Sequence, residues 1–382
     1  MMKKQYSHLV LFLSLCTLTA CNDSKNEDSI DPDPLPPSIT YHVEGYAELG
    51  AFDHNSTLTV FPLDKSLAHI EEQAYGGKVE TDYGLFSASG NMKFQESLYF
   101  EVQVTGNFFN GTKGRRSEHK TTLRAINHVI NHADEERSIN RYIKLPATNV
   151  NIFTQLTAAR ICTLLKKAAG YNEMSHTITD IYRNASEQAL KEVLTAFSIS
   201  DIYVSMLSID PTRASFSQYN APASMMAAVS NILLTSVDEE LLDTFFTEWD
   251  KDFAPDGRID NEDIKESIRD GQQSLKYTNV YKQLDSFYKA YDFKSDFPEF
   301  WKFVDRNGDG ILDKQDKPDD FEITEEELTP SQQQCIQLLE QVNKYLRDFL
   351  QTECVWEANF CGAIGPIPDY PRSEEHTSEL QS

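Results

Sequence analysis

The spacing of apolar residues changes once along this chain, and that change constrains the fold most. Between residues 41 and 126, apolar and polar residues alternate in short runs such as Tyr41–Ala47 and Leu98–Val104. A period of two is typical of strands with one buried face. In 149–371 apolar residues recur three and four apart, the helical period. The sequence therefore predicts a multidomain protein: a β part, a polar linker over 127–148, and an α-helical domain.

The β part contains turn signals between its apolar runs. Gly76-Gly77, Gly90-Asn91 and Asn110-Gly111 are expected to be turns. Several short strands at this spacing favour a small β-sandwich. In the second part we expect six to eight helices, with the clearest patterns at 152–165, 185–194, 225–234, 239–249, 275–288 and 331–350.

The first 20 residues resemble an export signal. Two lysines precede the apolar run Leu9–Leu18, which is shorter than the ~20 residues of a membrane span. The small residues before Cys21 suit a lipoprotein signal peptidase, which would leave a lipidated cysteine as the mature N-terminus. The alternative is an ordinary secretory signal with a chance cysteine. Asn22 is not the Asp of the inner-membrane retention signal, so an outer-membrane lipoprotein is favoured.

The two ends outside the folded parts have their own signatures. Residues 21–40 are rich in Asp, Ser, Asn and Pro, which predicts a disordered tether. Residues 372–382 resemble the translation of a sequencing adapter, so we treat them as a non-native tail. On this interpretation the authentic C-terminus is missing beyond about Pro371.

The net charge of -25 limits the partners. Such a surface repels nucleic-acid phosphates and anionic lipid headgroups, so nucleic acid is excluded as a partner. Membrane attachment would then depend on the acyl chains of Cys21. An oxidising compartment would permit disulfides. Cys354 and Cys361 are the favoured pair and Cys162 lies in a helical pattern as a buried thiol, but pairing among these three and Cys335 stays open.

Several segments resemble known proteins. Asp82–Ser87 is similar to a turn of transthyretin-like, carboxypeptidase-regulatory-like domains. The whole plan resembles a family of bacterial surface lipoproteins with an N-terminal β-sandwich and an all-helical second domain. That resemblance rests on Val60–Asp64, Asn149–Leu156 and Glu192–Phe197 and covers roughly half the chain. It implies a surface protein without an established catalytic activity.

The strongest site pattern is an EF-hand-like calcium loop at 305–316. Calcium loops place oxygen ligands at positions 1, 3, 5, 7, 9 and 12 and glycine at 6. Gly310 occupies position 6, and Leu312 at position 8 is expected to face the core. The expected Ca²⁺ ligands are Asp305, Asn307, Asp309, the main-chain carbonyl of Ile311, Asp313 and Asp316.

The calcium loop departs from helix–loop–helix sensors at its end. Position 12 is Asp316 rather than glutamate, which resembles dockerin loops more closely, and Pro318 prevents a long regular exiting helix. A helical approach is indicated by Phe297, Phe300 or Trp301, and Val304. The alternative interpretation is an aspartate-rich turn that binds no metal.

A second, weaker loop precedes the first one. Gly257 occupies position 6, but Ala254 at position 3 cannot coordinate. The loop would be a vestigial partner, because such loops usually pack in pairs. Its possible ligands are Asp252, Asp256, Asp260 and Asp263.

Other catalytic or metal patterns are weak. His128 and His132 stand four apart, but Val129 occupies the place where a zinc protease needs glutamate, so a solvated linker is favoured over zinc. No nucleophile elbow, phosphate-binding glycine loop or C-x-x-C motif is present. The preferred function is a non-enzymatic, calcium-stabilised surface lipoprotein. The alternatives are a glycan- or protein-binding subunit of a surface uptake or adhesion system, and an enzyme without a recognisable motif, such as a glycosidase, which needs only two carboxylates.

Overall fold

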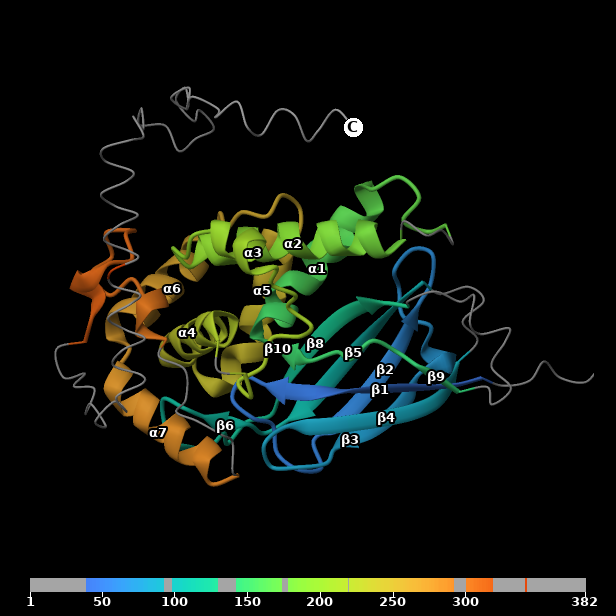
Figure 1. The fold of residues 1–382 in the computed structure, drawn as a ribbon, viewed down its shortest axis with the longest axis horizontal. Coiled ribbons are helices and arrows are strands. Elements are labelled where there is room, and N and C mark those ends of the chain that lie inside the picture. Colours follow the sequence, from blue (N-terminus) through green and yellow to red (C-terminus); the bar gives the residue numbers. More distant parts are fainter. Residues whose placement is uncertain are drawn as a thin grey trace, which may run out of the picture. The chain divides into compact units, whose positions relative to one another are not determined.

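The β part is one curled, mixed sheet of eight strands, and helices follow it along the chain (Figure 1). The strand order is β10-β1-β4-β3-β2-β5-β8, and β9 pairs with β1. Strands β9 and β10 run parallel to β1, whereas the other pairs are antiparallel. The strands are β1 Ile39–Glu48, β2 Thr57–Leu63, β3 Tyr75–Val79, β4 Leu85–Met92, β5 Tyr99–Gly106, β8 Thr121–His128, β9 Tyr142–Lys144 and β10 Val150–Asn151.

This computed structural model confirms the expected order of a β part followed by an α-helical part. The residues described belong to one compact unit up to Pro318, apart from Gln341. Seven α-helices lie among them, within the expected number: α1 Ile152–Lys167, α2 Ile178–Ala196, α3 Ile202–Leu207, α4 Ala221–Ser236, α5 Leu242–Phe253, α6 Glu262–Ser274 and α7 Tyr277–Lys289. The structure describes residues 39–92, 98–129, 142–173, 178–218, 220–291, 300–318 and 341, so the helix expected at 331–350 lies outside them.

The sheet differs from the expected sandwich in extent and arrangement. Its described strands make a single curled sheet and one separate hairpin, where we expected two stacked sheets. It also continues beyond residue 126, because β9, from the expected linker, and β10, at the start of the expected α-helical domain, pair with β1. Strand β8 itself ends at His128.

Two of the three expected turns are strands. Gly76-Gly77 lies inside β3 and Gly90-Asn91 inside β4. The reason is close packing: a Cβ at Gly90 would lie 2.2 Å from the ring of Tyr75. Glycine in a strand often marks such an approach rather than a turn. Asn110-Gly111 does form the expected hairpin turn, between β6 Phe109–Asn110 and β7 Arg115–Arg116.

Helix α1 packs against both the sheet and the other helices. It contacts β8, α2, α4 and α5. Its first seven residues, Ile152 to Ala158, are all buried, so no face of these first two turns meets solvent. A helix buried all round lies inside a core rather than on a surface. Asn151 caps it by accepting from the Thr154 amide at 3.0 Å.

Strand β8 is an edge of the sheet, and helix side chains cover its free backbone groups. Asp243 accepts from the Thr122 amide at 3.0 Å, and Gln155 accepts from the Arg124 amide at 2.9 Å. The Tyr182 hydroxyl donates to the Ile126 carbonyl at 2.7 Å. A bare edge strand is a template for pairing with other chains. The helical part therefore protects this edge, one backbone group at a time.

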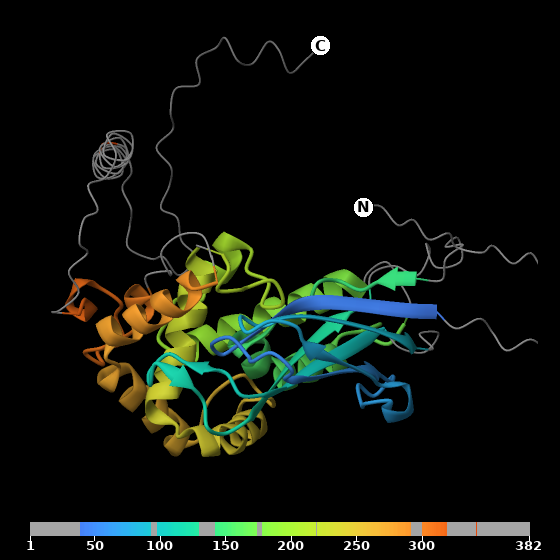
Figure 2. The same cartoon turned by 90° about the horizontal axis from the view of Figure 1, so that it is seen from below.

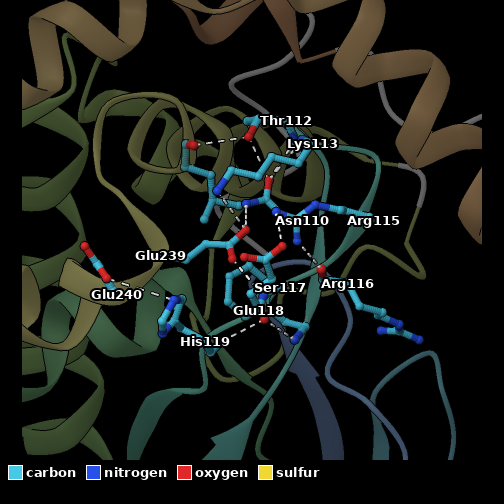
Figure 3. Close-up of polar contacts among 12 residues, drawn as sticks. Asn110, Thr112, Lys113, Arg115, Arg116, Ser117, Glu118, His119, Glu239 and Glu240 are labelled. Atoms are coloured by element: carbon cyan, nitrogen blue, oxygen red, sulfur yellow. Dashed lines mark hydrogen bonds and ion pairs between the residues drawn. The ribbon is translucent and has the colours of Figure 1, made fainter.

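The β6–β7 hairpin ties the sheet to the helices from another side (Figure 3). Buried Glu239 accepts from the Asn110 amide side chain at 2.7 Å and the Glu118 backbone amide at 2.8 Å. Lys113 lies 3.1 Å from the same carboxylate. The ring of Phe109 stacks on Phe287 of α7 with centroids 4.1 Å apart. The buried polar groups of this hairpin and of Glu239 are thus hydrogen-bonded or ion-paired, as buried polar groups in proteins generally are.

Candidate functional site

Residues 305–316, called the acidic loop below, fold as a series of tight turns closed by aspartates. Asp305 accepts from the amides of Gly308 and Gly310, at 2.8 and 2.9 Å. Both glycines have positive φ, 74° and 79°, which side chains disfavour. The positive φ of Gly310 explains the glycine at position 6 of the loop, which is the position where calcium loops also require one.

The far end of the acidic loop returns to its start. Asp316 accepts from the Arg306 amide at 2.8 Å with Oδ1 and from the Asp313 amide at 3.0 Å with Oδ2. A 3-10 helix spans Lys314–Asp316, which agrees with the short exit expected before Pro318. The expected helical approach is only the 3-10 helix Trp301–Phe303, and Phe297 lies outside the described residues.

Burial within the acidic loop is uneven. Asp305 and Asp316 are only 3% and 1% exposed, whereas Asn307, Asp309 and Asp313 are exposed. In the part of the chain that the structure describes, no Lys, Arg or His lies within ion-pair distance of any of these aspartates. Burial removes the hydration of these two carboxylates at a cost in free energy, which the main-chain amides they accept offset but which no described side-chain cation balances. A bound cation would relieve that cost.

The side chains are not gathered around one point. Among the described residues, no three His, Cys, Asp or Glu side chains converge closely enough to hold an ion. The Oδ1 atoms of Asp309 and Asp313 accept main-chain amides within the loop, from Ile311 and Gln315. Ile311 is 61% exposed and Leu312 is half-buried. The donor set fits calcium, which prefers carboxylate and carbonyl oxygens.

The weaker loop, 252–263, is held by a protein cation and is called the Arg160 loop below. The Arg160 guanidinium donates to the carbonyls of Ala254 and Pro255, at 3.1 and 2.9 Å. The same group pairs with both oxygens of Glu192, at 2.7 and 2.9 Å. Two helices, α5 and α6, flank this loop as expected. Sequence reasoning missed Arg160 because it lies some 90 residues away, on α1.

The four aspartates of the Arg160 loop differ in their hydrogen bonds and in their exposure. Asp252 accepts from the amides of Asp260 and Asn261, at 2.8 and 3.1 Å. Asp256 accepts from the Arg258 amide at 3.0 Å. Asp260 and Asp263 are exposed. The two loops differ in how they are held: the Arg160 guanidinium binds two main-chain carbonyls of the Arg160 loop, whereas no described Lys, Arg or His pairs with the acidic loop.

A hollow of about 550 Å³ lies between the two loops. We call it the loop hollow. Its walls come from both loops and from α2 and α6: Glu192, Thr195, Ala196, Ser198, Gly257, Arg258, Ile259, Lys265, Ile268, Arg269, Gln272, Asp305, Gly308, Asp309 and Gly310. The two loops are therefore neighbours, as paired calcium loops are.

A larger cleft, about 690 Å³, opens where β8 meets α2 and α3. His128 lies in its wall, buried in β8, and not in a solvated linker as we expected. Its Nε2 contacts the Thr179 hydroxyl at 3.1 Å, and burial lowers its pKa to about 4. The ring stacks on Tyr182 with centroids 4.6 Å apart. His132, the other half of the zinc pattern, lies outside the described residues.

The remaining expected sites are only partly covered by the structure. Cys162 is a free, half-buried thiol on α1, and burial raises its pKa to about 11. Cys21, Cys335, Cys354 and Cys361 lie outside the described residues. Among the described helices, none is long and apolar enough to cross a membrane.

Comparison with protein-family models, with curated proteins and with solved structures finds no match to this chain. The resemblance to surface lipoproteins and to dockerin loops therefore stays a prediction from the sequence.

Proposed function

We propose that this protein is a non-enzymatic, calcium-binding lipoprotein of the outer membrane, attached by lipid on Cys21. One observation carries the calcium part. Asp305 and Asp316 are buried in one loop with no cationic partner among the described residues. Ca²⁺ would be held by Asp305, Asn307, Asp309, Ile311, Asp313 and Asp316, as the EF-hand-like pattern predicts.

Calcium would act on stability rather than on a reaction. An ion that binds only the folded state stabilises it by RT ln(1 + [L]/Kd), about 2.7 kcal/mol at 100 times Kd. For a domain of this size that corresponds to a melting-temperature increase of roughly 5–10 °C. Extracellular modules often have Kd values of ~10⁻⁴–10⁻³ M. Millimolar calcium is therefore the relevant range for the measurement.

The test is thermal unfolding in calcium and in chelator. We expect wild type to melt at a higher temperature in calcium, and Asp305→Asn to lose that difference. Asp256→Asn is the matched control, because Asp256 also closes a turn by accepting a main-chain amide but in the Arg160 loop. Magnesium should substitute poorly, because it demands short octahedral contacts. Equal melting temperatures in calcium and chelator, with no binding heat in calorimetry, would exclude the site.

The lipid anchor is tested separately. Metabolic labelling with a fatty acid should mark the wild-type chain and not Cys21→Ala. The anchor is needed in this proposal because a surface of net charge -25 repels anionic lipid. A Cys21→Ala chain that still incorporates the fatty acid contradicts the assignment.

A binding role toward a surface protein is the second candidate. The observation that favours it is an apolar patch on α3 beside the larger cleft: Ile202, Met206 and Leu207 are 45%, 68% and 42% exposed. Exposed apolar patches often mark interaction surfaces. A photo-reactive residue at Met206 should form cross-links in intact cells, whereas one at Leu241, 50% exposed elsewhere, should not. Equal cross-linking at both positions would remove this candidate.

A further inference from the structure

The loop hollow combines cationic side chains with an apolar wall. Arg258 and Arg269 are exposed and line it together with Lys265. Neither arginine has an ion pair in the part of the chain that the structure describes. Lys265 pairs with Glu262 at 2.8 Å on its own helix. In a chain with net charge -25, two arginines without an ion pair at one hollow are available to bind an anion.

The lining of the loop hollow also contains acidic side chains. Asp305 and Asp309 belong to the acidic loop, and both oxygens of Glu192 already accept from Nε and Nη2 of Arg160. Without a bound metal, the two aspartates offset the free arginines and would repel an incoming anion. With Ca²⁺ in the acidic loop, their charge is neutralised and the cations dominate the loop hollow.

We infer that the loop hollow binds a small organic carboxylate, and that it does so when calcium occupies the acidic loop. This inference rests on the proposed calcium function and adds the ligand that calcium would admit. Arginine recognises carboxylates through paired, charge-assisted hydrogen bonds. The half-buried Ile259 and the buried Ile268 supply apolar contact for the body of the ligand, which an inorganic ion does not need.

The size of the loop hollow agrees with this ligand class. Small-molecule sites span roughly 300–1,000 Å³, and the loop hollow has about 550 Å³. That volume accommodates a sugar acid or a similar compact anion. Because binding free energies are reciprocal, the carboxylate should also tighten calcium binding by the same factor.

The experiment titrates the full chain with galacturonate by calorimetry, in calcium and in chelator, with galactose as the uncharged control. We expect galacturonate to bind at least about fivefold more tightly in calcium, within the usual range of coupling between sites. The double variant Arg258→Gln, Arg269→Gln should lose this binding and keep the calcium-dependent melting shift. Arg183→Gln, Arg213→Gln is the matched control, because it removes the same charge from the larger cleft.

The outcomes separate the two claims. Calcium binding without any galacturonate binding overturns the inference and leaves the proposed function standing. Equal binding of galactose, or undiminished binding in the Arg258→Gln, Arg269→Gln variant, also overturns it. Galacturonate affinity that is the same in calcium and in chelator overturns the coupling. Absence of any calcium heat or melting shift refutes the proposed function itself, independently of the carboxylate titration.

Discussion

Replacing Glu48 by glutamine should stabilise this protein at neutral pH. Glu48 ends β1 and is 0% exposed. Its carboxyl accepts from the Ser215 hydroxyl and the Phe216 amide, each at 3.2 Å, and no Lys or Arg pairs with it among the described residues. Burial raises its pKa from 4.5 to about 8, despite those two hydrogen bonds. The folded protein therefore holds this side chain protonated at neutral pH.

The magnitude follows from the shift in pKa. An acid whose pKa is raised on folding favours the folded state fully below its unfolded pKa, and that contribution is lost as pH rises toward the folded pKa. Each pH unit between 4.5 and 7 removes about 1.4 kcal/mol. At pH 7 wild type has lost about 3 kcal/mol of unfolding free energy through Glu48. Glutamine does not titrate, so Glu48→Gln should avoid this loss.

The assay is urea unfolding at several pH values from 5 to 8, followed by tryptophan fluorescence. The stability of Glu48→Gln minus that of wild type should be small at pH 5 and should grow toward pH 8. Glu44→Gln, on the same strand, is the control. Its partly exposed carboxylate pairs with Lys144, which lowers its pKa, so the substitution should cost at most ~1 kcal/mol and show no gain with pH. A Glu48→Gln difference that is constant with pH would refute the reasoning.

Three further substitutions test the packing described above. Glu239→Gln should lower the unfolding free energy by about 1–3 kcal/mol, since it weakens charge-assisted bonds of a buried group, whereas exposed Glu240→Gln should change it little in the same urea titration. Gly90→Ala should cost about 1–3 kcal/mol by forcing a methyl group into the Tyr75 ring, and an unchanged urea midpoint would contradict the close approach. Arg160→Met should destabilise by about 3–5 kcal/mol, because it leaves Glu192 and two carbonyls without their donor; a thermal midpoint equal to that of wild type would show that the Arg160 loop is held otherwise.

Sequence patterns predicted the parts of the fold that depend on local periodicity. The alternation at Tyr41–Ala47 became β1, and the helical spacing from Ile152 became α1. Sequence patterns did not predict the features that depend on a residue far away in the chain. Gly90 resembles a turn residue, but it lies within a strand. Glycine is needed there because the Tyr75 ring of the neighbouring strand leaves no room for a side chain. The return of β9 to pair with β1 brings together residues about 100 positions apart, which no local pattern records.

The candidate site divides in the same way. Gly310 and the spacing of the aspartates predicted a loop of tight turns, because glycine conformation and side-chain turns are local. The sequence did not predict that Arg160 would hold the other loop, or that Arg258 and Asp309 would face one hollow. Both depend on how helices far apart in the chain pack, which is a tertiary effect.

The covered edge of β8 has a consequence for how the chain is made. Synthesis proceeds from the N-terminus, so the sheet strands leave the ribosome well before Tyr182 and Asp243, whose side chains close that edge. Until then β8 offers unpaired amides and carbonyls to any other nascent strand, which is a route to aggregation. A truncated chain ending before α5 lacks Asp243 and should therefore aggregate more readily than the full chain. Figure 2 shows the helices, drawn in green to orange, beside the strands in blue and teal.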